Sequence, residues 1–578
     1  MSWPYQFIDL DEAQSHARRL SLDRHGLIAQ LSALVPVAVV LAYRGYRWAT
    51  LKVVASEGGE YAAVPSSPGA KELRLSRTGK WEIRARKLIW WLGDEIVFLG
   101  TSWGTRDQMV GGAAWFLWLL FLCTQGTGVD YMHFTKRFGI VGVSQFPVQY
   151  LLSLKYLNPI AWALGSSHED VNRWHRVLGR IIYVLLFAHA ILYLNFYYQK
   201  GLLAAKLVSR VPVLGLTAIT GMHALSGTAF QIVRQYSYRV FFITHLIVAL
   251  ALPPIIYFHT HHAKVYVWEA FIVFVLDIAS RKIFKTVVAE SKVEFISGTD
   301  LIKVVGRIPV AKIGRFVRNP GTHVYMSIPA GSRPNKNPVS AAHLIFDFVF
   351  NPFSVASVDE STGDLTLVAR HHNGPMTNAF ASFANNSSGS EQHVKLAFDG
   401  PYGCASRFPN LSGPEFDRIL LVAGGVGATF TLPLYRWIQT ENPAARVQMV
   451  WAVRGAGDAT WPVTEDGKSI IDDDNIKVFL TGDILDDSAE GDYGRTSSDV
   501  ELESFTAAAR RRGYASKGGN KRPNLQKIVD DVFRMGQEER VAVLVCGPEA
   551  MARDLRSHVG VWVQKGRKVW WHNEGFGW

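Results

Sequence analysis

The apolar residues of this chain are distributed unevenly between its two halves. Before about residue 280 they gather in long runs, whereas the remainder alternates apolar and polar positions with turns, as strands and helices do. A run of about 20 apolar residues is long enough to cross a bilayer as a helix. The pattern predicts membrane spans near residues 27–43, 109–126, 138–160, 172–197, 212–231, 238–259 and 264–280.

Basic residues predict the orientation of these spans, because Lys and Arg usually flank the cytoplasmic ends. The loop 44–108 holds eleven of them and is therefore expected in the cytoplasm. Within it, the short apolar segment 88–100 is interrupted by Asp94 and Glu95, and we interpret it as interfacial or re-entrant. Counting spans from this loop puts the amino terminus outside, with no separate extracellular domain ahead of the membrane region, and everything after residue 280 in the cytoplasm. The other basic clusters agree with this side: Arg173, Arg176, Arg180, Arg234, Arg239, Arg281 and Lys282.

Charge and cysteine content exclude two other classes of protein. The formal net charge of +12 could indicate a nucleic-acid partner, but in a chain with membrane spans it is explained by the cytoplasmic flanks, so no nucleic acid is expected. The three cysteines (Cys123, Cys404 and Cys546) lie far apart and have neither a disulfide framework nor metal-site spacing.

Two of the predicted spans begin and end with histidine at the same separation. "HRVLGRIIYVLLFAH" runs from His175 to His189, and "HLIVALALPPIIYFH" runs from His245 to His259. Fourteen helical steps rise about 21 Å and return to within about 40° of the starting face. Both spans run outward, so His175 is expected level with His245 and His189 with His259. A single membrane histidine often only bonds a neighbour, but two matched pairs predict ligation of two b-type haems, one near each membrane face.

Helical register selects among the three histidines that end the second of these spans. His261 and His262 would turn the ring away from the face of His245, which favours His259, although a kink at Pro253 and Pro254 weakens the argument. The other two would lie at the outer mouth, either inert or briefly holding a metal substrate. We interpret His223, alone in its span, as structural.

After residue 291 the sequence is typical of an antiparallel barrel that holds a flavin. "NPFSVASV" (351–358), "LTLVARHHNGPMT" (365–377) and "FDGPYG" (398–403) are strand and loop segments with turn residues. In this order they predict that Phe353 lies on the flavin ring and Ser354 reaches its edge. Arg370 and the turn from Gly374 to Thr377 are expected at the pyrophosphate.

A glycine-rich turn and two strand ends predict a nucleotide site in the last part of the chain. "RILLVAGGVGATFTLPLYRWI" (418–438) reads as a strand, a turn and a helix, in which Gly424, Gly425 and Gly427 let the backbone approach a phosphate. Arg454 ends a second strand, where it could pair with a ribose 2′-phosphate. "CGP" (546–548) ends a later strand, again at the edge where parallel sheets bind ligands. The polar stretch 484–525 reads as a disordered insertion.

The order of histidine pairs, flavin barrel and nucleotide motifs resembles the ferric reductase and NADPH oxidase superfamily. The ending "HNEGFGW" and the turn "AGGVGATFTLP" resemble its fungal ferric reductase branch, over roughly residues 110–578. The resemblance implies haem ligands at His175, His189, His245 and His259. It implies a flavin motif at Asn351, Pro352, Phe353 and Ser354, with Asn351 where the family usually has histidine. It implies nucleotide residues at Gly424, Gly425, Gly427, Thr429, Arg454, Cys546, Gly547 and Pro548, and it implies that Trp578 stacks on the flavin until the nicotinamide displaces it.

The same resemblance implies a fold and a domain plan. We expect an N-terminal span and cytoplasmic loop (1–108) and an all-α transmembrane two-haem domain (109–285). A ferredoxin-NADP reductase-like module follows, with an antiparallel β-barrel FAD domain (286–415) and an α/β parallel-sheet NADPH domain (416–578).

The function implied is that of a metalloreductase, with the cofactors FAD, NADPH and two b-type haems. Electrons would pass from cytoplasmic NADPH to ferric chelates outside, with cupric ions as a second substrate, and no acid or base residue would be needed. The alternative with the same electron path is an NADPH oxidase that produces superoxide, and a third interpretation is a haem sensor or scaffold without turnover. The plasma membrane is the first expectation and the vacuolar membrane the second, with an iron permease or a ferroxidase as candidate partners downstream.

Overall fold

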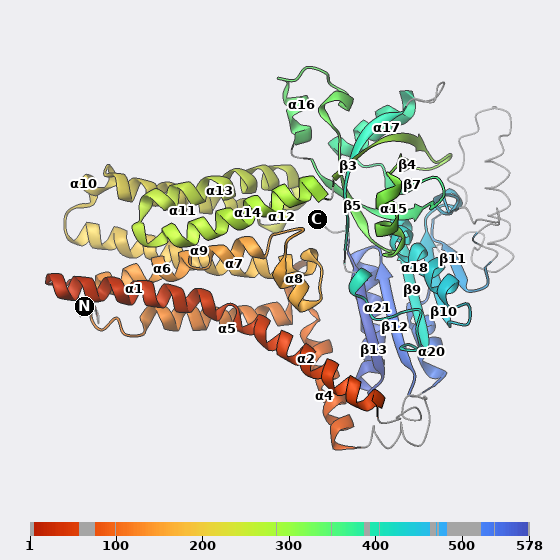
Figure 1. Cartoon of the computed structure of the whole chain (residues 1–578), viewed down its shortest axis with the longest axis horizontal. Coiled ribbons are helices and arrows are strands. Elements are labelled where there is room, and N and C mark those ends of the chain that lie inside the picture. The colour runs from red at the N-terminus through yellow and green to blue at the C-terminus, as the bar shows by residue number, and fades with distance from the viewer. Residues whose placement is uncertain are drawn as a thin grey trace. The chain divides into compact units, whose positions relative to one another are not determined.

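The structure is a computed structural model of the whole chain, and its contacts divide the chain into two compact units (Figure 1). A helical unit comprises residues 1–58 and 91–284, and a mixed unit comprises residues 59–90 and 285–577. The fold therefore changes where the hydropathy pattern changes. The structure describes residues 5–56, 76–98, 100–284, 286–347, 349–386, 393–403, 405–462, 470, 473–482, 522–536 and 538–575.

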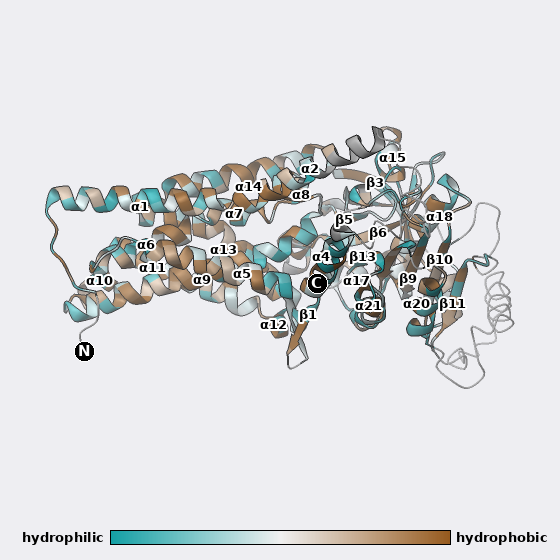
Figure 2. Ribbon diagram, turned by 90° about the horizontal axis from the view of Figure 1, so that it is seen from below, coloured by the Kyte–Doolittle hydropathy of each residue, from teal (hydrophilic) through white to brown (hydrophobic). Residues whose placement is uncertain are grey.

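The helical unit consists of long and short helices that are rich in apolar residues (Figure 2), and many of its large apolar side chains are exposed. Such a surface suits lipid, where helices satisfy their own backbone hydrogen bonds. In the described part of the chain, four segments are long and apolar enough to cross a membrane: Glu12–Tyr46, Arg106–Thr124, His168–Gln199 and Tyr238–His259. The helices are α1 (Glu12–Ser32), α2 (Val35–Ser56), α5 (Arg106–Thr124), α6 (Tyr131–Val143), α7 (Phe146–Leu151), α8 (Pro159–Leu164), α9 (His168–Gln199), α10 (Leu203–Leu207), α11 (Arg210–Thr228), α12 (Gln231–Tyr236), α13 (Tyr238–His259) and α14 (Lys264–Phe284).

The predicted continuous span 138–160 is wrong as a single helix. Helix α6 begins at Tyr131 and ends at Val143, and α7 then restarts with Pro147 in its first turn. Proline is tolerated there because that position has no intrahelical acceptor to lose. Residues 152–158 are not helical. The apolar composition predicted a membrane segment, but it did not reveal where the backbone breaks.

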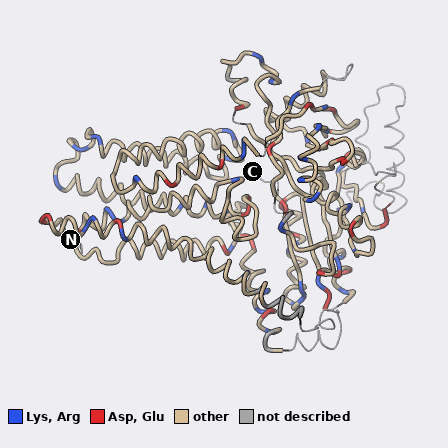
Figure 3. Tube along the Cα trace, in the orientation of Figure 1, with Lys and Arg blue, Asp and Glu red and all other residues tan. Residues whose placement is uncertain are grey.

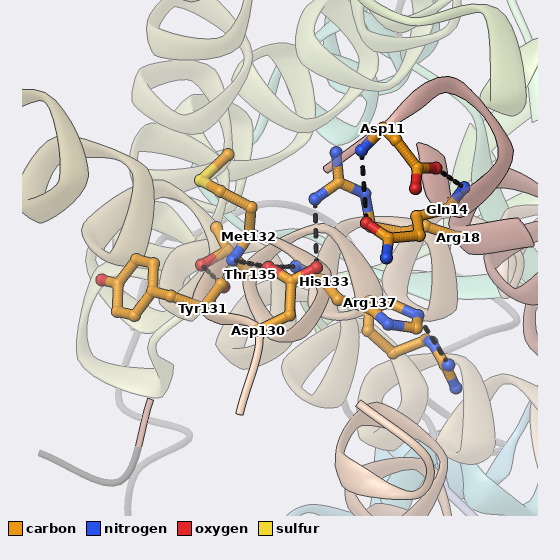
Figure 4. Close-up of polar contacts among 9 residues, drawn as sticks. All are labelled: Asp11, Gln14, Arg18, Asp130, Tyr131, Met132, His133, Thr135 and Arg137. Carbon is orange, nitrogen blue, oxygen red and sulfur yellow. Dashed lines mark hydrogen bonds and ion pairs between the residues drawn. The ribbon is translucent and has the colours of Figure 1, made fainter. Parts of the chain in front are cut away.

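A buried arginine ties α6 to the end of α5. Arg137 has no exposed surface, and its Nη1 donates to the carbonyl of Leu122 at 2.9 Å, while Nη2 lies 3.0 Å from Nε2 of His133. The carbonyl end of a helix carries partial negative charge, which favours a guanidinium. Next to it, Asp130 accepts from the amide of His133 and pairs with Arg18 of α1 at 3.1 Å (Figure 4). These contacts fix three helices at one end of the helical unit.

The first part of the mixed unit is a closed antiparallel barrel, as the sequence predicted. Its strands follow each other around the barrel in the order β3-β4-β7-β6-β5-β8. Side chains of β3 alternate between buried and exposed, which is the period-2 pattern of a barrel wall. The strands are β3 (Thr286–Phe295), β4 (Leu301–Arg307), β5 (His323–Ser327), β6 (Asn351–Val358), β7 (Asp364–Arg370) and β8 (Val394–Tyr402), with helices α15 (Val310–Val317), α16 (Ala341–Leu344) and α17 (Pro375–Asn386).

The second part is a five-stranded parallel sheet in the order β11-β10-β9-β12-β13, which confirms the predicted α/β fold. Alternate residues of β9 pack against α18 on one face and against α20 and α21 on the other. The predicted insertion 484–525 lies outside the described residues except for 522–525, where Leu525 begins α20. The elements are β9 (Arg418–Gly424), α18 (Ala428–Glu441), β10 (Val447–Val453), β11 (Ile476–Leu480), α20 (Leu525–Arg534), β12 (Arg540–Cys546), α21 (Glu549–Gln564) and β13 (Lys568–Glu574).

Helix α4 (Arg77–Leu92) packs on this sheet despite lying far away in the sequence. The rings of Trp90 and Trp571 meet edge to face with centroids 5.8 Å apart. The guanidinium of Arg556 lies 4.1 Å from the Trp90 ring centroid, and its Nη2 donates to the Trp90 carbonyl at 2.8 Å. In the described residues, segment 88–100 forms the end of α4 and the first strand of a hairpin, β1 (Glu95–Phe98) and β2 (Thr101–Thr105), so it is not one continuous element; the interfacial or re-entrant location stays a prediction.

Candidate electron-transfer site

The four histidines predicted as haem ligands lie on two helices of the helical unit, His175 and His189 on α9, and His245 and His259 on α13. The rings of His175 and His245 are 6.0 Å apart between centroids, and their planes are inclined by 55°. Two imidazoles that bind one metal ion from opposite sides, each nitrogen about 2 Å from it, need a separation of this order. His175 and His245, named the inner pair because their ends of the two spans are the ones expected nearer the cytoplasm, therefore fit a bis-histidine iron site; His189 and His259 are named the outer pair.

The hydrogen bonds of these histidines define which ring nitrogen carries the proton. Nδ1 donates to a backbone carbonyl at 2.9 Å in His175, His189 and His259, with Gln149, Thr135 and Val211 as the respective acceptors. Since the carbonyl can only accept, the proton must be on Nδ1, and Nε2 keeps its lone pair. That is the form of histidine that ligates metal, oriented by its second hydrogen bond.

Two of the four histidines depart from this simple arrangement. The Nδ1 atom of His245 is buried without a hydrogen-bond partner, so its protonated nitrogen is not defined by a contact. The side-chain nitrogen of Gln149 lies 3.3 Å from Nε2 of His175, within reach of its lone pair. Both departures concern the inner pair, whereas His189 and His259 have matched surroundings.

Three further histidines of this unit, His223, His261 and His262, have other contacts. Nδ1 of His262 lies 2.6 Å from a carboxylate oxygen of Asp23, and the ring of His261 is 5.9 Å from that of His262. Among the described residues, no three His, Cys, Asp or Glu side chains form a cluster that could hold a metal ion. His223 donates to the carbonyl of Ile219 on its own helix.

The predicted flavin residues gather along one part of the barrel. Asn351, Pro352, Phe353 and Ser354 form the start of β6, with Asn351 exposed and Ser354 buried. Ser354 lies directly opposite the buried His323 of β5 in the ladder. Sequence reasoning missed His323, which "GTHVYMSIP" presents only as one position of an alternating strand.

Arg370 joins the predicted flavin residues to the predicted nucleotide turn. Its Nη2 pairs with Oδ2 of the buried Asp458 at 3.1 Å, and a Cβ on Gly425 would lie 3.9 Å from the same nitrogen. After Arg370 in the sequence, Gly374 directly precedes α17 and Thr377 lies in the first turn of that helix, where the Thr377 hydroxyl contacts the carbonyl of Gly374 at 3.4 Å. A guanidinium placed between a barrel strand and a glycine turn can bind the pyrophosphate of a dinucleotide.

Asp458 is a second residue that sequence reasoning missed. It lies in "RGAGDAT", four residues after Arg454, and its only signal is a carboxylate in an otherwise apolar and small-residue loop. Because a carboxylate beside an arginine holds the guanidinium in one orientation, Asp458 acts here as a positioning partner of Arg370.

Two predicted nucleotide motifs about 120 residues apart meet at the carboxyl edge of the sheet. Strands β9 and β12 are neighbours, with Ala423 opposite Cys546. A Cβ on Gly427 would lie 2.1 Å from the carbonyl oxygen of Cys546, so only glycine fits. Gly425 has a φ of +56°, a conformation that glycine adopts without strain. The pairing brings together Gly424, Gly425, Gly427, Thr429, Cys546, Gly547 and Pro548.

The thiol in this edge is not a nucleophile. Burial raises the pKa of Cys546 well above its ordinary value, and the Glu574 carboxylate on the neighbouring strand raises it further. The thiol thus stays protonated at neutral pH, and Cys546 contributes packing and a carbonyl rather than covalent chemistry. Arg454 follows β10 and is exposed, where a ligand can reach it, and Trp578 lies outside the described residues.

Comparisons with known proteins agree with this arrangement. Residues 138–256 match the ferric reductase like transmembrane component, and residues 416–560 match the ferric reductase NAD binding domain. "Ferric/cupric reductase transmembrane component 2" of Schizosaccharomyces pombe is 23% identical over 76% of this chain and 80% of its own length. "Ferric reductase transmembrane component 1" of the same species is 24% identical, over 73% of this chain and 76% of its own length.

Among solved structures, phthalate dioxygenase reductase can be superimposed on 51% of this chain, using 70% of its own chain, with 14% sequence identity and a TM-score of 0.29. The helical histidine pairs, the barrel and the nucleotide sheet occur in one chain that matches both ferric reductase domains and these fungal reductases. The chain therefore contains the transmembrane and the NAD binding domain of the ferric reductases, and it is similar to fungal ferric reductases over about three quarters of its length.

Proposed function

We propose that this protein is a transmembrane metalloreductase that passes electrons from NADPH through FAD and two b-type haems to ferric chelates. Cupric chelates are a second substrate, as the name of the ferric/cupric relative suggests. The observation that carries the proposal is the facing of His175 and His245 across 6.0 Å in a chain that also matches the ferric reductase NAD binding domain.

Backbone and side-chain groups of this protein hold the cofactors in position. The carbonyls of Gln149, Thr135 and Val211 hold three imidazoles with Nε2 available as an iron ligand. Arg370 and the glycine turn bind phosphate groups, and Phe353 offers an aromatic face to the flavin. When bound, the flavin and the haems would supply the conversion of hydride transfer into single-electron transfer.

The orientation that we propose follows from the basic flanks. Lys and Arg concentrate in the loop 44–108, which we place in the cytoplasm, and the basic pair Arg281 and Lys282 at the end of the last span agrees with that side. The FAD and NADPH domains, which follow that span, then lie in the cytoplasm, and the metal is reduced on the other side. Figure 3 marks Lys and Arg along the described parts of the chain. The plasma membrane is the proposed location, with the vacuolar membrane second. Ferrous iron released outside would suit an iron permease or a ferroxidase.

The experiment that tests this function measures ferrous chelate formation by the purified protein with NADPH. Reduction is expected to continue without oxygen and to be insensitive to superoxide dismutase. If reduction requires oxygen and disappears with the dismutase, superoxide is the product, and the protein is an oxidase.

Arg454→Gln is expected to raise the KM for NADPH by roughly 10- to 100-fold and to leave the KM for NADH unchanged. The loss corresponds to one charge-assisted hydrogen bond to the 2′-phosphate, worth about 1.5–3 kcal/mol. Arg446→Gln is a matched control, because Arg446 is an exposed arginine just before the same strand, at its opposite end, and pairs with Glu539. An equal change in the KM for NADPH and the KM for NADH would contradict the assignment of Arg454 to the 2′-phosphate.

A further inference from the structure

His189 and His259 each make the same two contacts, with a backbone carbonyl and with a glycine, on two different pairs of helices. His189 of α9 donates to the carbonyl of Thr135 and lies against Gly139, both on α6. His259 of α13 donates to the carbonyl of Val211 and lies against Gly215, both on α11. In each case the glycine follows the carbonyl residue by four positions, so the carbonyl and the glycine share one helix face.

The glycines touch the imidazole rings themselves. A Cβ on Gly139 would lie 2.7 Å from Cε1, 2.8 Å from Nδ1 and 3.2 Å from Nε2 of His189. A Cβ on Gly215 would lie 2.8 Å from Cε1, 3.4 Å from Nδ1 and 3.6 Å from Nε2 of His259. All three nearest atoms belong to that one ring in both cases. Any side chain at these positions must therefore displace the ring.

Two contacts hold each ring: the glycine packs against the ring, and the Nδ1–H donates to the carbonyl one helical turn before that glycine. A ring displaced by a methyl group cannot keep that hydrogen bond at 2.9 Å. Glycine also makes a helix interior less stable than alanine would. The repeated use of glycine against an imidazole thus needs a reason other than helix stability.

The inner histidines do not share this arrangement. His175 has a carbonyl acceptor in Gln149, but its neighbour on that side is the Gln149 amide rather than a glycine. Nδ1 of His245 is buried and has no acceptor. The glycine contact therefore belongs to the pair formed by His189 and His259.

We propose that Gly139 and Gly215 are positioning residues that set the ring planes of His189 and His259 as ligands of the outer haem. This inference rests on the proposed function, since it requires those histidines to be haem ligands. Residues that contact a metal ligand orient it and thereby tune the metal. A methyl group at either position is expected to weaken haem binding or to alter the potential and the ligand-plane geometry of that haem alone.

The test compares Gly139→Ala and Gly215→Ala with two controls on the same helices. At Gly142 of α6 a Cβ would meet a Leu186 side-chain carbon at 2.9 Å, and at Gly221 of α11 it would lie 3.4 Å from Val248. The readouts are haem per purified full-length chain, the electron paramagnetic resonance spectrum and the potentiometric titration. The proposal predicts loss of up to one haem, or a shifted signal and midpoint for one haem, in the two test variants only. Unchanged test variants, or equal effects in the controls, would overturn it.

A double substitution keeps the inference testable if Gly139→Ala is unstable. Removing the ring with His189→Ala makes room for the methyl group, so Gly139→Ala should lower the Tm in the wild-type background but not in the His189→Ala background. Gly142→Ala should have the same effect in both. An equal loss of Tm for Gly139→Ala in both backgrounds would overturn the proposed contact. If the wild-type protein itself binds no haem, the proposed function fails. If the wild-type protein binds two haems and the glycine variants are unaffected, only the inference about the glycines fails.

Discussion

Replacing His189 with alanine is expected to leave one b-type haem per chain and to lower NADPH-driven ferric chelate reduction by at least about 100-fold. Loss of an outer-shell partner alone can cost a metal site 10- to 100-fold, and here the ligand itself is removed. NADPH should still bleach the flavin absorbance, because the barrel and the nucleotide sheet belong to the other unit. The measurements are the haem content, the flavin spectrum and the chelate reduction rate of the purified variant.

His223→Ala is the matched control for that experiment. His223 is also a histidine of the helical unit, but it donates to the carbonyl of Ile219 in its own helix and contacts the rings of Tyr183 and Phe187. It should keep two haems and most of the activity. A normal two-haem spectrum in His189→Ala would show that the ligand assignment is wrong.

Replacing Gly427 with alanine is expected to abolish reduction with NADPH as the donor. The added methyl group would lie 2.1 Å from the carbonyl oxygen of Cys546, and backbone atoms cannot move aside as a flexible side chain can. Overpacking typically costs about 1–3 kcal/mol, and a contact this short with backbone belongs at the upper end of that range. The turn must therefore shift, which removes the backbone amides that face the phosphates. Fluorescence titration with NADPH measures the loss of nucleotide binding, and thermal unfolding of the full-length protein measures the loss of stability.

Gly455→Ala provides the control, because a Cβ on Gly455 would meet no atom within 4 Å. It lies in the neighbouring turn after β10 and should bind NADPH normally. The steric argument fails if Gly427→Ala binds NADPH as tightly as Gly455→Ala does.

The features that the sequence predicted well depend on local geometry. Fourteen helical steps return a residue to nearly the same face, and span counting made both histidine helices run outward, so His175 was expected level with His245, whose ring lies 6.0 Å away in the structure. Alternating burial along strands predicted the barrel, and apolar runs ending in glycine predicted the parallel sheet. The turn that holds Gly427 and the strand end at Cys546 were both expected at the carboxyl edge of a parallel sheet, where ligand sites form; that the two residues touch is a finding of the structure.

The features that the sequence did not predict depend on contacts between distant segments. The pairing of Arg370 with Asp458 joins residues 88 positions apart, and no periodicity in either segment indicates it. The packing of Trp90 on Trp571 and Arg556 likewise required the fold, since segment 88–100 alone suggested a membrane surface. The break between α6 and α7 was missed because an apolar run does not show where its backbone leaves the helix.

The central claim is that electrons cross the bilayer through this one chain. The most direct measurement uses sealed vesicles containing the protein, with ferric chelate and an impermeant ferrous indicator trapped inside and NADPH added outside. We predict that the indicator inside develops colour for wild type and for His223→Ala, but not for His189→Ala. If ferrous iron forms only when the chelate is on the same side as NADPH, the flavin reduces it directly, and the transmembrane account is contradicted.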